Sequence, residues 1–216
     1  MLTFIYSPIV YDVIRWRDQT SRIYTFCAKI WGKGSSRLPC EKRANITKGK
    51  TTYELKDKDC PPNSLVKLCF SSDFFIEEAD EWRDGCWDFI RRRKDCIFVT
   101  TTKRPERIKD SVPSDWGDGW EHIYISISIE NQEMADIRLK HFLEAPVKHR
   151  EVFCSPLIGP ISLGKYLDTG LIKCVNVGGE MAPKADVRPI EYEWVKNLYL
   201  EAKERNMMSI SPKRQA

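Results

Sequence analysis

From about residue 63 onward, short apolar runs alternate with longer amphipathic segments. The apolar runs are rich in β-branched and aromatic residues, and they predict strands near residues 65–70, 96–102, 122–129, 151–157 and 172–179. Apolar residues at helical spacing predict helices between these strands, at 77–93, at 105–112, between Asn131 and Pro146, at 163–167 and at 191–205. The segment therefore reads as five strands, each followed by a helix.

Alternation at this spacing favours parallel strands joined by right-handed helical crossovers. Two architectures compete, an open doubly wound sheet and a barrel of the TIM type. A complete eightfold barrel typically needs about 250 residues, and this chain, with 216 residues, is shorter than that. We therefore predict an α/β fold with a parallel (β/α) barrel of TIM type, partial or incomplete, although an open sheet fits nearly as well.

The chain divides into three parts by composition. Residues 1–62 form an irregular basic amino-terminal region, in which β-prone residues around Lys48-Gly49-Lys50 predict a hairpin. Residues 63–206 form the barrel-like domain, and residues 207–216 read as a frayed basic tail.

Composition indicates an ordinary globular protein. Hydrophobic residues make up 42% of the chain, charged residues make up 31%, and the formal net charge is +4. No window approaches about 18 uncharged apolar residues, so no membrane-spanning helix is expected. The start of the chain lacks a basic leader and a long apolar region, so we expect a cytoplasmic protein whose cysteines are thiols.

The eight cysteines show no CxxC pair, which zinc ribbons and iron–sulfur motifs use to aim two thiolates at one metal. Four cysteines lie inside apolar runs and are expected in the core. Cys27, Cys40 and Cys60 lie in polar sequence and are the remaining candidate metal ligands. The three histidines form no ligand-like pattern.

Charged residues follow most of the predicted strands directly. The carboxyl ends of parallel strands meet at one rim, where ligands bind in both architectures. Lys103 and Arg104 are candidates for binding an anionic group, because basic residues at a helix start oppose the dipole. Glu130 is expected to pair with one of them. Asp73 and Asn131 also lie at this rim, and each of them could instead cap a helix. After the last strand come Gly178, Gly179 and Glu180, and a carboxylate after two glycines can hold an amine or a hydroxyl.

Five segments in this order resemble a phage-associated family of uncharacterised proteins, which is itself similar to radical S-adenosylmethionine enzymes. They are SSDFF (71–75), TTKRPER (101–107), SIENQEMADIR (128–138), CSPLIGPI (154–161) and VGGEMAPKADVR (177–188). The resemblance implies a TIM-like barrel, a [4Fe–4S] cluster and S-adenosylmethionine. It implies cofactor binding by Asp73, Gly178, Gly179 and Glu180, and substrate binding by Lys103, Arg104, Glu130 and Asn131.

The family usually carries a WNP..GC motif and a CxxCY motif near its start, and residues 1–60 contain neither. We therefore expect either a radical S-adenosylmethionine-like enzyme or a cluster-lacking remnant of one, and no normal site-differentiated cluster in this chain. The alternative is a non-catalytic phage accessory protein that binds a nucleic acid or a protein partner. Its support is the basic amino-terminal third, where aromatic residues lie among lysines and arginines from Arg15 to Lys50.

Overall fold

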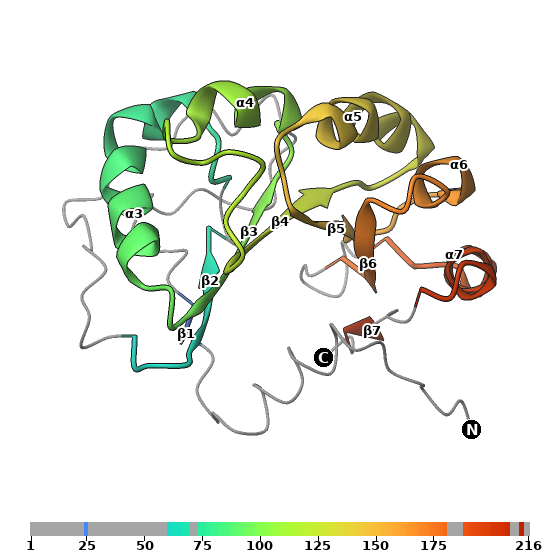
Figure 1. Ribbon diagram of the computed structural model, residues 1–216. Coiled ribbons are helices and arrows are strands. Elements are labelled where there is room, and N and C mark those ends of the chain that lie inside the picture. The colour runs from blue at the N-terminus through green and yellow to red at the C-terminus, as the bar shows by residue number, and fades with distance from the viewer. Residues whose placement is uncertain (1–23, 26–59, 70–72, 181–187, 208–211, 214–216) are drawn as a thin grey trace.

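The computed structural model describes residues 24–25, 60–69, 73–180, 188–207 and 212–213 (Figure 1). Its strands are β1 Tyr24–Thr25, β2 Leu65–Leu68, β3 Ile97–Thr102, β4 Ile123–Ser128, β5 His149–Cys154, β6 Ile172–Gly178 and β7 Pro212–Lys213. Its helices are η3 Glu77–Ala79, α3 Asp80–Arg92, η4 Pro105–Arg107, α4 Ile108–Ser111, α5 Gln132–Glu144, α6 Gly164–Leu167 and α7 Tyr192–Glu204. All five predicted strands and their helices are present.

The strands form one parallel sheet in the order β1-β2-β3-β4-β5-β6-β7. A doubly wound sheet reverses its order at a switch point, and the described strands show no such reversal. Helical crossovers of one hand then place every helix on the same face of the sheet, and Figure 1 shows α3 to α7 following one another around its outside. Within the described residues, β1 and β7 end this order and are not paired with each other, so a closed barrel is not shown.

Local chemistry explains the ends of the helices. The long helix α3 has Asp80 and Glu81 in its first turn and Arg91 and Arg92 in its last, which complements the helix dipole. Pro105 occupies the first turn of η4, where no backbone donor is needed. Within the segment predicted as a basic tail, Pro212 and Lys213 are described, and they form β7, which pairs with β6. The predicted hairpin around residues 48–50 lies outside the described residues.

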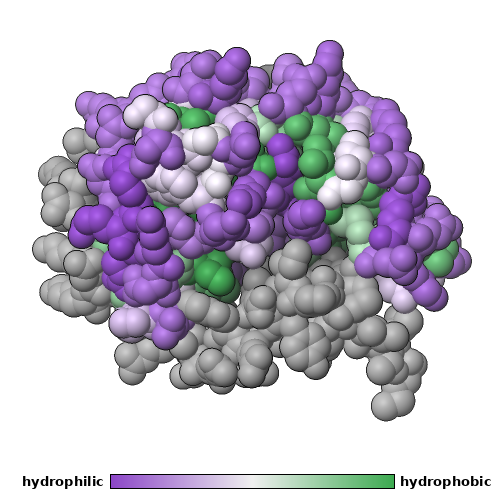
Figure 2. All heavy atoms as spheres, in the orientation of Figure 1, coloured by the Kyte–Doolittle hydropathy of each residue, from purple (hydrophilic) through white to green (hydrophobic). Residues whose placement is uncertain are grey.

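The face of the sheet under the helices is apolar. Phe98, Ile125, Ile127 and Val152 alternate along the middle strands and belong to one buried core with residues of α3 and α5. The outward surfaces of the helices are mostly hydrophilic in Figure 2. None of the helices in the described part of the chain is long and apolar enough to cross a membrane.

One buried cation on the helix-covered face stabilises the end of a helix. Arg150 of β5 donates to the carbonyl oxygens of Phe142 (3.2 Å), Leu143 (3.3 Å) and Ala145 (2.6 Å), at the carboxyl end of α5. The last carbonyl groups of a helix have no partner within it, so this guanidinium satisfies acceptors that would otherwise be buried without one.

The opposite face of the sheet, which we call the inner face, differs in character. Its residues alternate with the core residues along each strand. In β5, His149, Glu151 and Phe153 on this face are partly exposed and their neighbours are buried, whereas Ser126 of β4 is fully buried. Parallel sheets usually bury apolar side chains on both faces. Here the inner face carries polar and charged side chains, among them Lys67, Thr101, Ser126, Glu151 and Asn176.

Candidate functional site at the carboxyl end of the sheet

Asp73 joins the end of β2 to the end of β3. Its side chain is 2% exposed. Oδ1 accepts from the backbone N–H of Phe75 (3.0 Å) and from Oγ1 of Thr102 (2.7 Å), and Oδ2 accepts from the backbone N–H of Lys103 (2.8 Å) and from Nη1 of Arg104 (2.8 Å). The alternative that Asp73 caps a helix is wrong, because η3 begins at Glu77 and its N-cap position is Ile76.

A second group of charges joins the ends of β3 and β4. Lys103 pairs with Oε1 of Glu130, as the sequence predicts, and Nη1 of Arg138 donates to Oε2 of the same carboxylate at 2.7 Å. The same Arg138 nitrogen also donates to the carbonyl oxygen of Ser128 at 2.6 Å. The side chains of Lys103, Glu130 and Arg138 are 15%, 12% and 9% exposed, so little solvent screens this triad.

The loop after β5 lies against the same rim. The backbone N–H of Ile158 donates to the carbonyl oxygen of Glu130 (3.0 Å), and that of Leu157 donates to the carbonyl oxygen of Gly178 (2.9 Å). The exits of β4, β5 and β6 are therefore tied together through backbone hydrogen bonds. Asn131 caps α5, because its Oδ1 accepts from the backbone N–H of Met134 at 2.9 Å.

Glu180 follows the two glycines after β6 and pairs with Arg188. Its Oε2 accepts from the backbone N–H (3.1 Å) and Nε (2.9 Å) of Arg188, and its Oε1 accepts from Nη2 (2.5 Å). These bonds lower the pKa of the Glu180 carboxyl to about 2. Both oxygens of the carboxylate that was predicted to hold an amine or a hydroxyl thus accept from a neighbouring arginine in this structure.

The structure brings four of the predicted residues into direct contact, as the pairs Asp73–Arg104 and Lys103–Glu130. Sequence reasoning missed Arg138 as a member of the group. The helical spacing of the sequence places Arg138 on the same face of α5 as Ala135, Leu139 and Phe142, and this spacing could have identified it. All four side chains are buried in the structure. A charge on the apolar stripe of a helix requires a buried partner.

The inner face below this rim was also missed. Thr101, Ser126, Glu151 and Cys174 are successive partners in the registers of β3 to β6, so they form one row across the sheet. Oγ of Ser126 donates to Oε2 of Glu151 at 2.9 Å. Burial raises the pKa of the Glu151 carboxyl, against the smaller effects of Ser126 and of the charge on Lys67.

Cys60, the candidate metal ligand that falls within the described residues, does not lie at this rim. Cys60 is fully buried in the apolar core before β2, and its carbonyl oxygen accepts from Nη2 of Arg93 (2.6 Å) just after α3. This is the amino end of the strands, opposite the rim. Cys27 and Cys40, and the basic residues from Arg15 to Lys50, lie outside the described residues. Within the described ranges, no three His, Cys, Asp or Glu side chains are grouped so as to hold a metal ion.

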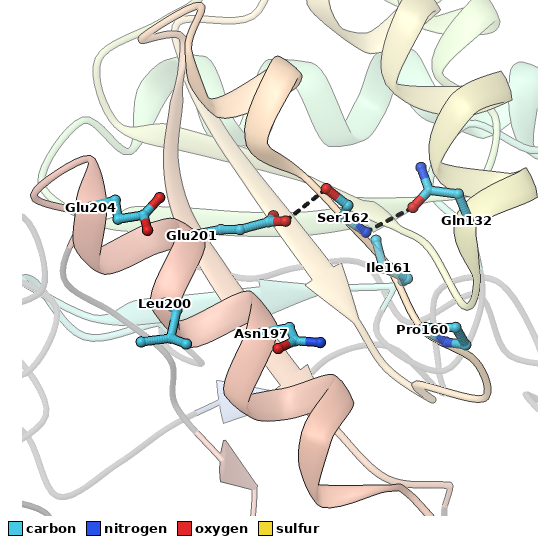
Figure 3. A pocket seen from close by; sticks show the side chains of 8 residues that line it. All are labelled: Gln132, Pro160, Ile161, Ser162, Asn197, Leu200, Glu201 and Glu204. Carbon is cyan, nitrogen blue, oxygen red and sulfur yellow. Dashed lines mark hydrogen bonds between the residues drawn. The ribbon is translucent and has the colours of Figure 1, made fainter.

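A shallow groove of about 450 Å³ lies on another part of the surface, between α7 and the segment before α6 (Figure 3). Ser162 lines it, with its hydroxyl donating to Glu201 and its backbone N–H donating to Gln132. None of the rim residues predicted from the sequence lines this groove.

Comparison with known proteins adds one assignment. Neither the curated proteins nor the solved structures include a match to this chain. Residues 14–209, nearly the whole chain, match the model of the family described as "Protein of unknown function (DUF5131)". The chain that carries this charged rim and polar inner face therefore belongs to the family of proteins of unknown function DUF5131.

Proposed function

We propose that this chain is a partial TIM-type (β/α) barrel that binds S-adenosylmethionine at the carboxyl end of its sheet, as a cluster-lacking remnant of a phage-associated, radical S-adenosylmethionine-like enzyme. The observation that carries the proposal is the meeting of charged side chains from successive strand ends above a polar inner face. In parallel α/β proteins ligands bind at this edge of the sheet.

The charges suit a zwitterionic ligand. The methionine part of S-adenosylmethionine carries a carboxylate and an amino group. In the proposal Lys103 and Arg104 bind the carboxylate, and Glu130 accepts from the amino group. A zwitterion can exchange partners with the Lys103–Glu130 pair and leave each charge neutralised, so binding exposes no unpaired buried ion. Asp73 already accepts four hydrogen bonds and acts by positioning Arg104.

The described residues do not fit a [4Fe–4S] cluster at this site. A cluster of this kind needs several thiolates that converge. The described candidate, Cys60, is buried at the opposite end of the strands from the rim. We therefore derive no chemical step through a cluster. Anaerobic reconstitution with iron and sulfide tests this part, and Cys60→Ala is expected to leave the iron content unchanged.

Isothermal titration calorimetry of the full chain with S-adenosylmethionine tests the binding proposal. We expect saturable binding that Lys103→Ala weakens by about tenfold, equivalent to about 1.4 kcal/mol. Lys148→Ala is the matched control, because Lys148 also pairs with a glutamate but is 46% exposed. Absence of binding, or an equal effect of the two variants, would contradict the proposal.

A further inference from the structure

The groove between α7 and the segment before α6 is lined by none of the residues to which we assign S-adenosylmethionine binding (Figure 3). Its walls come from the second half of α7, from the first residue of α5 and from residues 160–162. A pocket for a small ligand usually buries most of the ligand surface. A shallow groove of about 450 Å³ leaves much of its occupant in solvent, so it suits a segment of a macromolecule better than a small cofactor.

Part of the lining is apolar. Pro160, Ile161 and Leu200 contribute to it. Leu200 is 42% exposed and Pro160 is exposed, whereas Ile161 is buried beside them. A single exposed leucine is ordinary on a protein surface. Here it shares one groove with two further apolar residues, so an aliphatic side chain of a partner can lose contact with water against all three.

The charged part of the lining is negative. Glu201 and Glu204 are its charged residues, and none of the described residues that line the groove is a lysine or an arginine. Oε1 of Glu201 accepts from Oγ of Ser162 at 2.6 Å, and Oε2 accepts from the backbone N–H of Leu163 at 2.5 Å. Both donors are neutral, so these bonds fix the carboxylate in place without neutralising its charge.

Glu204 is the more accessible of the two carboxylates. Its side chain is 73% exposed, and its Oε2 lies 3.5 Å from Nη1 of Arg205, beyond the usual hydrogen-bond range of roughly 2.7–3.2 Å. That nitrogen donates to the carbonyl oxygen of Glu201 at 3.0 Å, and Nε of the same arginine pairs with Asp168. Glu204 therefore retains the capacity to accept from a cation that a partner brings.

Asn197 adds an uncharged polar group to the groove. It lies in the interior of α7, where asparagine is a poor helix former, and its side chain lines the groove. A side-chain amide can both donate and accept, and each residue of an extended polypeptide offers one backbone donor and one acceptor. The two carboxylates would repel the phosphates of a nucleic acid, so the lining favours a polypeptide.

We propose that this groove binds a segment of a partner protein that presents an aliphatic side chain next to a lysine or an arginine. The aliphatic side chain packs against Leu200 and Pro160, the cation pairs with Glu204, and the amide of Asn197 pairs with the backbone of the segment. Charge complementarity specifies the occupant, because the charges of the lining are all negative. The proposal goes beyond the proposed function and uses no residue of the rim.

Fluorescence anisotropy of the full chain with dye-labelled short peptides tests the charge requirement. One peptide has leucine between lysine and arginine, and the other has leucine between two glutamates. We expect saturable binding of the basic peptide, weakened by salt, and binding of the acidic peptide that is weaker by about tenfold or more. Glu204→Lys is expected to weaken binding of the basic peptide by a similar factor. Glu193→Lys is the matched control, because Glu193 is an exposed glutamate of α7 that pairs with Lys196 and does not line the groove.

Leu200→Ser tests the apolar contact and is expected to weaken binding of the basic peptide. Its matched control is Ile137→Ser, since Ile137 is 52% exposed on α5 and lies outside the groove. All four positions are exposed, so circular dichroism is expected to show folded variants. Absence of saturable binding, equal binding of the two peptides, or an equal effect of a groove variant and its control overturns the proposal. Self-association in analytical ultracentrifugation that Leu200→Ser abolishes would assign the groove to a second copy of this chain and overturn it as well.

Discussion

Removal of Arg138 tests whether the buried triad at the rim stabilises the fold. Arg138→Met keeps an unbranched apolar stem and removes the guanidinium. It deletes the bonds from Nη1 to Oε2 of Glu130 and to the carbonyl oxygen of Ser128. Hydrogen bonds that involve a charged group contribute roughly 1.5–3 kcal/mol each. Removing one partner of a buried ion pair costs roughly 3–5 kcal/mol.

Lys103 still neutralises Glu130 in this variant, so we expect a loss at the lower end, about 3 kcal/mol. In a chain of this size each kcal/mol lowers Tm by roughly 2–4 °C, so the expected decrease is roughly 6–12 °C. Glu130→Gln removes the negative charge between two cations and is expected to cost at least as much. Urea denaturation followed by circular dichroism measures both losses, as a lower midpoint at an unchanged slope.

The control is Lys196→Met, which breaks an ion pair with Glu193 on the surface of α7. The two side chains are 45% and 63% exposed, and such pairs contribute about 1 kcal/mol or less. If Arg138→Met lowers the free energy of unfolding by no more than this control does, the triad is not the buried, interdependent group that we describe, and the reasoning about the rim fails with it.

Three further predictions follow from the same contacts. Asp73→Ala removes the acceptor of four hydrogen bonds between the ends of β2 and β3 and is expected to cost about 3 kcal/mol in urea denaturation, against a smaller loss for the exposed Asp118→Ala. Arg188→Ala is expected to raise the pKa of Glu180 from about 2 toward 4.5 in a carbon-detected NMR titration. Because a lowered carboxyl pKa stabilises the fold above the ordinary value, the natural chain loses this advantage over the variant as the pH falls from 4.5 to about 2. Burial raises the pKa of Cys86 to about 12, so brief iodoacetamide treatment of the folded chain at pH 8 is expected to leave Cys86 unlabelled, and rapid labelling would show that this face of α3 is not buried in the core.

The elements of the fold were predictable because their signals are local. The run at 96–102 contains β3. The helix predicted at 77–93 is present as η3 at 77–79 followed by α3, which begins three residues after the predicted start and ends one residue before the predicted end. The cap at Asn131 was equally clear, since it depends on a side chain and a backbone N–H three residues away. Hydrophobic periodicity and helix capping act over a few residues, so one sequence suffices to find them.

The site was predictable only where neighbouring strand ends supply its residues. The pairing of Lys103 with Glu130 follows from two parallel strands that end at one edge. The row from Ser126 to Glu151 depends on the register between strands, which no residue spacing in the chain encodes by itself. The engagement of Glu180 by Arg188 is a property of side-chain geometry, which determines whether a carboxylate faces a ligand or a neighbouring arginine.

Arg150 has a consequence for the inner face that its role at α5 does not suggest. Side chains alternate between the two faces of a strand, so a shift of one residue in β5 would turn Arg150 inward and place Glu151 in the apolar core. The three carbonyl oxygens at the end of α5 hold Arg150 on the helix side and thereby penalise that shift. The hydrogen bonds of Arg150 on the helix-covered face therefore favour the observed register of β5, and that register places Glu151 on the inner face.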